Sequence, residues 1–204
     1  MRTVFPAIAG RREPSINSAT IAITAEDNWT ELRHGQIWEY KQNKQILDLG
    51  RSFQMKDVFD TAVLNEVKGR MTLLKPNSER QWGKMNPAQM LAHCSLAMDM
   101  AMGKIRPPRI WIGRLLGPLA KKSLITKGEP MRRNSMTDKS VLVTDERDFV
   151  AERQRLVESI DRFAKGGPEA CTKHPHFFFG PLTPTEWASL MYQHLDHHLR
   201  QFGV

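Results

Sequence analysis

The feature that most constrains the fold is a helix start near the C-terminal end, Thr183-Pro184-Thr185-Glu186. Thr183 can cap free amide groups, Pro184 fits the first helical position, and Glu186 can bond back to the cap. Apolar side chains then recur at helical spacing until a glycine near the last residue. The pattern predicts a long helix over residues 183–202.

Three further segments carry comparable helical signals. Residues 57–74 repeat apolar side chains three and four positions apart, and Lys75-Pro76 ends the pattern. Asn86-Pro87-Ala88-Gln89 is a second capping sequence, for a helix that ends near Gly103. Residues 145–165 form the remaining amphipathic stretch, before two glycines. Four helices with little strand signal predict an all-α four-helix bundle.

A connection of about forty residues, 104–144, separates the second and third helices. It is long enough to let those helices run parallel, which predicts an up-down-down-up bundle. Within it, residues 109–119 are apolar with basic flanks, although Gly113, Gly117 and Pro118 weaken any long helix. Two interpretations stay open: a short helix packed like a lid over the bundle end, which we favour, or an interfacial membrane helix.

Residues 1–54 lack a sustained period and contain scattered proline and glycine. We predict a disordered or poorly structured N-terminal extension in front of a bundle spanning residues 55–204. Because Met55 opens the patterned region, we expect it to be the biological start; a genuine but divergent N-terminal arm is the alternative. Mass spectrometry of the protein made from its own promoter decides between them, and a mature N-terminus before residue 50 rules out the first.

Composition narrows the class of protein. Thirty Lys and Arg side chains against 22 Asp and Glu give a formal net charge of +8, but the basic residues are dispersed. No arginine-rich arm, zinc-finger spacing or aromatic ribonucleoprotein motif is present, which disfavours specific nucleic-acid binding. Two cysteines are too few for a disulfide framework. With no apolar run of spanning length and no signal-peptide pattern, we expect a cytoplasmic protein of bacterial type.

The chemistry of the chain is most visible in its histidines. His194 and His198 are four residues apart on the last predicted helix, so both rings lie on one face and can reach one metal ion. His93 lies about 9 Å along its helix from Pro87. If the second and fourth helices are antiparallel with level ends, His93 falls between the other two in height. The sequence thus predicts a metal site of His93, His194 and His198.

Simpler interpretations exist for each histidine. A single histidine on an apolar face, such as His93, is more often a hydrogen-bonded core residue, and histidine pairs four apart also occur on surfaces. His197 points about 100° away from His198, so we expect it to be exposed. His174 and His176 lie in a loop, where packing or loop polarity explains them, although they could line the mouth of a site.

Three motifs carry a resemblance to a known family. They are Gln81-Trp82-Gly83-Lys84-Met85 with Gln89-Met90-Leu91-Ala92-His93; Gly113-Arg114-Leu115-Leu116-Gly117-Pro118-Leu119; and Phe179-Gly180-Pro181-Leu182-Thr183-Pro184 with His194-Leu195-Asp196-His197-His198-Leu199-Arg200-Gln201-Phe202. Through them residues 55–204 resemble the DinB-like superfamily of metal-binding four-helix bundles, in a branch of unknown function. The resemblance implies that His93, His194 and His198 are the metal ligands and that His197 is not.

The resemblance also implies a cofactor and a chemistry. A divalent metal is expected, with zinc or nickel favoured and iron or manganese as alternatives. The family suggests thiol-dependent transfer or isomerisation, as in bacillithiol S-transferases and mycothiol-dependent maleylpyruvate isomerase, or metal-assisted hydrolysis of a small molecule. A low-molecular-weight thiol could be a second cofactor. The alternative is a non-catalytic helical binding or stress-response module with structural metal or none. The protein could form a homodimer.

No clear general base accompanies the three histidines. Asp196 neighbours them in sequence but points off their face. Gln201, one turn beyond His198, could orient a ligand or a substrate. Arg132 and Arg133 lie in the long connection, where a solvated loop is the favoured interpretation and contact with an anionic substrate the alternative.

Overall fold

A computed structural model describes residues 55–135 and 137–204 of the chain. Within these residues the protein is helical, with no strand and one isolated β-bridge between His176 and Gly180, so the all-α prediction is correct. The α-helices are α2 (Thr61–Leu73), α3 (Pro87–Ala101), α4 (Trp111–Lys121), α5 (Phe149–Gly166) and α6 (Pro184–Gln201). The predictions for residues 1–54 lie outside the described residues.

The two helices with capping boxes begin where the sequence predicts. In α3 the Asn86 side chain accepts from the Gln89 backbone N–H, and the Gln89 side chain accepts from the Asn86 backbone. Thr183 and Glu186 make the same reciprocal pair at the start of α6. These bonds satisfy amide groups that a helix start otherwise leaves without partners.

The other two long helices start later than predicted. The cap of α2 is Asp60, which accepts from two backbone amides, while Asp57 holds the turn before it. The cap of α5 is Asp148, three residues beyond the predicted start at Asp145. In both cases two aspartates three residues apart precede the helix, and the second of them, nearer the helix, is the cap.

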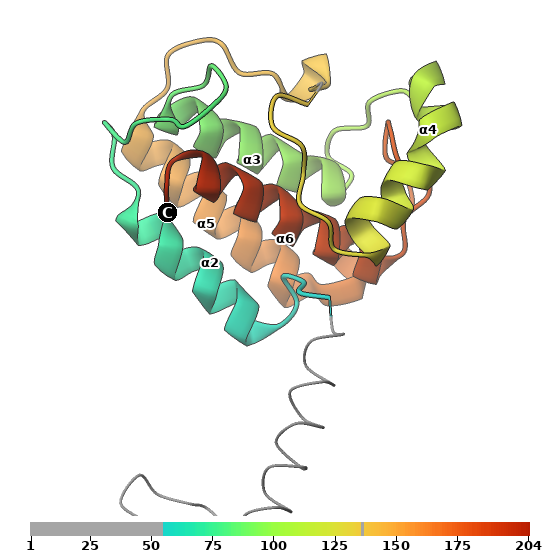
Figure 1. Ribbon diagram of the computed structural model, residues 1–204. Helices are drawn as coiled ribbons and strands as arrows, with labels where there is room; N and C mark the ends of the chain where they lie inside the picture. The colour runs from blue at the N-terminus through green and yellow to red at the C-terminus, as the bar shows by residue number, and fades with distance from the viewer. Residues whose placement is uncertain (1–54, 136) are drawn as a thin grey trace, which may run out of the picture. The chain divides into compact units, whose positions relative to one another are not determined.

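The long helices α2, α3, α5 and α6 lie side by side around one core (Figure 1). The largest fully buried side chains include Trp187, Phe163, Met71 and Leu74. The start of α3 lies beside the end of α6, where the Gln81 N–H donates to the Gln201 carbonyl at 2.8 Å. This pairing of opposite ends fixes the height of α3 residues against α6 residues.

Helix α4 lies outside these four helices (Figure 1). Its buried residues are Gly113 and Gly117, which contact the backbone of the loop at Phe178. A Cβ on Gly113 would come within 2.7 Å of the Phe178 Cα, and one on Gly117 would meet the Phe178 carbonyl. The glycines that we expected to weaken a helix therefore permit this one to approach the loop closely.

Replacing Gly117 with alanine should lower the free energy of unfolding by about 1–3 kcal/mol, because the new methyl group collides with backbone that has little room to move. Gly69→Ala is the matched control: Gly69 is exposed within α2 and a Cβ there meets nothing within 4 Å. It should raise stability by about 0.5–1 kcal/mol. Urea unfolding of both variants checks this, and equal effects would contradict the packing described.

None of the helices in residues 55–135 and 137–204 has the length and apolar character needed to cross a membrane. Of the two cysteines, Cys94 is buried and Cys171 is partly buried, and both are free thiols.

Candidate metal centre

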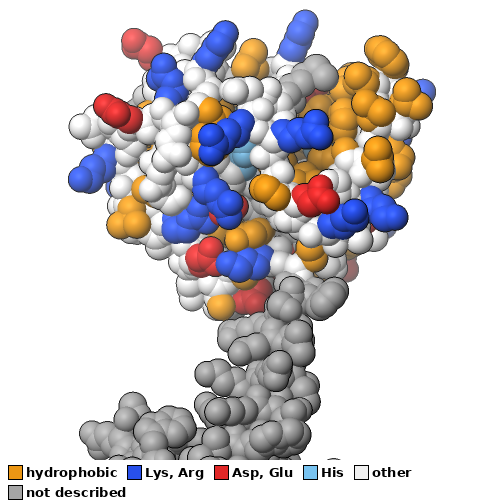
Figure 2. All heavy atoms as spheres, in the orientation of Figure 1, with side chains coloured by type: hydrophobic (Ala, Val, Ile, Leu, Met, Phe, Trp, Pro, Cys, Tyr) orange, Lys and Arg blue, Asp and Glu red, His pale blue; other side chains and the backbone are white. Residues whose placement is uncertain are grey.

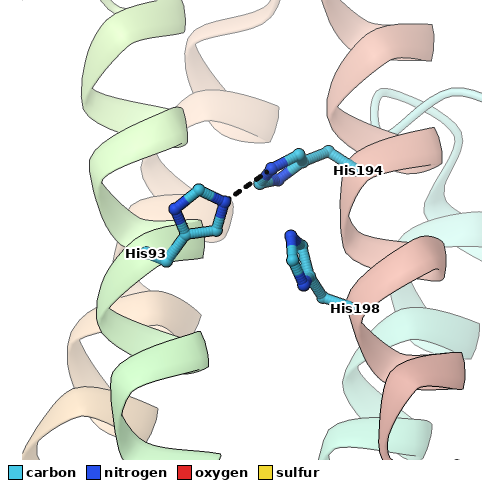
Figure 3. A group of neighbouring side chains, drawn as sticks. All are labelled: His93, His194 and His198. Atoms are coloured by element: carbon cyan, nitrogen blue, oxygen red, sulfur yellow. Dashed lines mark hydrogen bonds between the residues drawn. The ribbon is translucent and has the colours of Figure 1, made fainter. Parts of the chain in front are cut away.

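His93 from α3 and His194 and His198 from α6 point toward one another (Figure 3). One ring nitrogen from each residue lies within 4.8 Å of those of the other two. The matched height of α3 and α6 produces this cluster, because His93 lies one and a half turns into α3 while the other two lie within the last two turns of α6. The structure thus brings the three predicted residues together.

A backbone carbonyl fixes the ring of His93. Its Nδ1 lies 2.7 Å from the carbonyl oxygen of Val141, in a short 3-10 turn (Lys139–Val141) of the long connection. A carbonyl only accepts, so Nδ1 of His93 carries the hydrogen. The lone pair of the neutral ring is then on Nε2, the atom that faces the other two histidines.

Gln201 does the same for His198. The Gln201 Oε1 lies 2.8 Å from Nδ1 of His198, and the Gln201 Nε2 donates to the Trp82 carbonyl at 2.7 Å. The second bond fixes which way the amide points, so Nδ1 of His198 is again the donor. Its Nε2 lone pair faces the cluster. Gln201, which the sequence suggests as a residue that could orient a ligand or a substrate, thus contacts His198.

His194 completes the cluster from the more exposed side. Its Nε2 lies 3.0 Å from Nε2 of His93, and its side chain is only partly buried. Two imidazole nitrogens bound to one tetrahedral zinc at about 2.0–2.1 Å lie roughly 3.3 Å apart. The separation of the His93 and His194 nitrogens is therefore close to that of two ligands of one zinc ion.

Burial keeps these imidazoles neutral. It lowers the pKa of His198 to about 3, with the neighbouring His93 adding to the effect and the Gln201 bond opposing it. Burial also lowers the pKa of His93, against the Val141 carbonyl. The pKa of His194 falls well below its usual value through burial and through the two facing rings. Neutral imidazole is the form that binds metal.

Other residues near the cluster have different roles. His197 lies against the Trp82 ring, with centroids 5.4 Å apart. Asp196 forms ion pairs with Arg70 at 2.8 Å and with Arg200 at 3.0 Å, and so joins α6 to α2. Neither residue belongs to the three-histidine cluster. The expected exposure of His197 is not found: its side chain is partly buried, and its ring lies 5.1 Å from that of His198.

The loop residues that the sequence singled out, His174, His176 and Arg133, are not part of the three-histidine cluster. His176 is buried, and its Nδ1 accepts from the backbone amides of Phe178 and Phe179, so it fits the loop-polarity interpretation. His174 lies 3.5 Å from the Pro107 carbonyl. The exposed Arg133 guanidinium lies 4.3 Å from the centre of the Trp82 ring. In Figure 2 a histidine surface is visible among Lys and Arg side chains.

The sequence did not indicate the two backbone carbonyls that support the site. The Val141 carbonyl accepts from His93, and the Trp82 carbonyl accepts from Gln201. Every residue has a carbonyl, so no residue type marks these positions. The capping sequence that places Trp82 before α3 was visible, but its contact with Gln201 depends on how the helices pack.

Replacing Gln201 with leucine should weaken metal binding about 10–100-fold, because His198 loses the acceptor that orients its ring. A competition titration against a chromophoric chelator measures this. Gln154→Leu is the control, since Gln154 is on α5 and bonds to Glu158. Equal affinity in the two variants would show that the Gln201 contact is irrelevant to the site.

The chain was also compared with known proteins. Searches of curated proteins and of solved structures each return no match. A family model described as "Protein of unknown function (DUF1569)" matches residues 54–203. That span holds the whole histidine cluster with Trp82, Val141 and Gln201. The chain therefore belongs to the DUF1569 family of proteins of unknown function.

Proposed function

We propose that His93, His194 and His198 hold a divalent metal ion and that the protein is a metal-dependent enzyme acting on a small molecule. One observation carries the proposal. Two of the three rings present a lone pair to a common point while their second nitrogens donate to anchored oxygens, those of Val141 and Gln201. Metal-binding histidines nearly always have such an outer partner.

The ligand count favours chemistry over a structural role. Structural zinc sites are closed by four protein ligands, whereas three leave a position for water or substrate. A divalent metal held by neutral imidazoles keeps its full charge and can lower the pKa of a bound water or thiol. The three rings would hold the ion, and the partial exposure of His194 supports an opening on that side.

For the reaction, we infer thiol-dependent S-transfer or hydrolysis, from the resemblance to the DinB-like superfamily. We also propose the up-down-down-up order that the long connection 104–144 predicts. Three contacts support that order. The start of α2 meets the start of α6, where the Val58 N–H bonds to the Ala188 carbonyl. The start of α3 meets the end of α6. Phe59 before α2 stacks on Phe163 near the end of α5, at 5.3 Å.

Metal analysis of the full chain, purified without an affinity tag, tests the proposal first. About one divalent ion per chain is expected. Substoichiometric metal, with a content that His93→Ala leaves unchanged, would remove the site and favour the alternative of a non-catalytic helical module.

A cobalt-substituted sample then separates the two reactions. Glutathione, bacillithiol and mycothiol are added in turn, and a sulfur-to-cobalt charge-transfer band is expected for the thiol that the enzyme uses. An unchanged spectrum with all three thiols would leave hydrolysis as the reaction, which a panel of ester and amide substrates then measures.

A further inference from the structure

Helix α4 turns its large apolar side chains toward solvent. Trp111, Leu115 and Leu119 are 76%, 72% and 72% exposed, and Leu116 is 46% exposed. The first three are four residues apart, so they form one stripe along the helix. In Figure 2 hydrophobic side chains gather on the right, where Figure 1 places α4.

The packing of the helix fixes this exposure. At about 100° per residue, Gly113 and Gly117 lie on the face opposite the stripe. That glycine face touches the Phe178 backbone, where no larger side chain fits. The loop at Phe178 is in turn held by His176, which accepts from the Phe178 amide at 3.1 Å. If α4 were rotated to turn the apolar stripe inward, leucine side chains would collide with this backbone. The packing of α4 therefore keeps the stripe exposed to solvent.

The segment that carries the stripe has charged side chains of one sign only. Residues 104–128 contain no Asp or Glu and hold seven basic side chains, which are Lys104, Arg106, Arg109, Arg114, Lys121, Lys122 and Lys127. Lys104, Lys121 and Lys127 pair with Asp99, Glu186 and Glu129. Among the described residues, Arg114 and Lys122 form no ion pair, and both are exposed. Helical geometry places Arg114 at the edge of the stripe, three residues beyond Trp111.

We propose that α4 binds the surface of an anionic lipid bilayer, lying parallel to it with Trp111, Leu115 and Leu119 among the lipid chains. The features combine as in interfacial helices: an exposed apolar stripe, a tryptophan at one end of it, and basic side chains at its edge that can reach the headgroups. Anionic lipid is the occupant that complements the charge. The inference is independent of the metal centre.

A second copy of the chain is a poorer match for the same face. Two α4 helices meeting along their stripes would bring together Arg114 and Lys122 of each copy, with no acid in residues 104–128 to offset them. Like charges at close range oppose such contact. Lipid phosphates and carboxylates remove that cost and retain the apolar gain.

Vesicle sedimentation of the full chain tests the proposal. Binding to vesicles of phosphatidylglycerol and phosphatidylcholine is expected to exceed binding to pure phosphatidylcholine at least 10-fold, and to weaken as salt rises from 50 to 500 mM. In the double variant L115E/L119E the partition coefficient should fall by about 10-fold or more per leucine, because each loses its apolar burial.

The matched control is L73E/V150E, which makes the same change at two apolar side chains exposed by 62% and 61% on α2 and α5. It should bind vesicles like the wild type. Circular dichroism melts check that both variants stay folded, as expected for exposed positions. Because every sample keeps residues 1–54, binding that survives in L115E/L119E would assign the membrane contact elsewhere and overturn the proposal. Absence of vesicle binding, with self-association that L115E/L119E abolishes, would overturn it in favour of a dimer.

Discussion

His93→Ala is expected to lower metal affinity by at least about 100-fold and to leave the purified protein nearly metal-free. The variant removes the single histidine that α3 contributes to the cluster, while the His194/His198 pair on α6 remains. Removing a residue that hydrogen-bonds a metal-binding histidine lowers metal affinity about 10–100-fold, and removing the histidine itself should lower it further. Elemental analysis gives the metal content, and chelator competition gives the affinity.

His197→Ala is the matched control for this prediction. It changes a histidine on the same helix, next to His198, whose ring lies against Trp82 outside the cluster. Its metal content should equal that of the wild type. If His197→Ala lost metal and His93→Ala kept it, the ligand set would be wrong. Melting curves of both variants show whether a loss of metal reflects unfolding.

Acid should destabilise the metal-free protein strongly. Burial lowers the pKa of His198 to about 3, with a contribution from His93. Burial also lowers the pKa of His176 to about 3, where Arg109 adds to the shift and Asp138 opposes it. The ordinary value for histidine is about 6.5. Below pH 6.5 His176 and His198 therefore bind a proton in the unfolded chain but not in the folded protein.

Proton linkage gives the direction in which the free energy of unfolding changes with pH. A depressed folded pKa gives stability that is present above about pH 6.5 and is lost as the pH falls toward 3. Between pH 7 and pH 5 each of these two histidines should cost about 2 kcal/mol. His93 and His194 act in the same direction. The free energy of unfolding, measured by urea titration in the presence of a chelator, should therefore fall by about 4 kcal/mol or more.

His176→Gln isolates one part of this effect. The Gln oxygen can accept from the Phe178 and Phe179 amides, as the ring does, but it does not titrate. The loss between pH 7 and pH 5 should shrink by about 2 kcal/mol. A wild-type protein equally stable at both pH values would refute the burial of these rings.

Much of the helical framework could be read from local signals. The capping boxes at Asn86 and Thr183 act within four residues, so the sequence specifies them without help from the rest of the fold. The starts at Asp60 and Asp148 were misplaced because Asp57 and Asp145 are equally capable caps. Only packing decides between two such acids.

The histidine cluster was predictable because helix geometry converts sequence spacing into height. The pairing of His194 with His198 needs only a helix, and His93 needs only the relative height of α3 and α6. The carbonyls of Val141 and Trp82 were not predictable, since they belong to connections whose path depends on tertiary contacts. The same holds for α4, whose glycine face is explained by a loop sixty residues away in sequence.

X-ray absorption spectroscopy of the zinc-loaded full chain tests the central claim most directly. The account predicts a first shell with three imidazole nitrogens at about 2.0–2.1 Å and at least one further light atom, and two imidazoles in His93→Ala. A wild-type shell with one imidazole or none, or one containing sulfur from Cys94 or Cys171, would contradict the three-histidine centre.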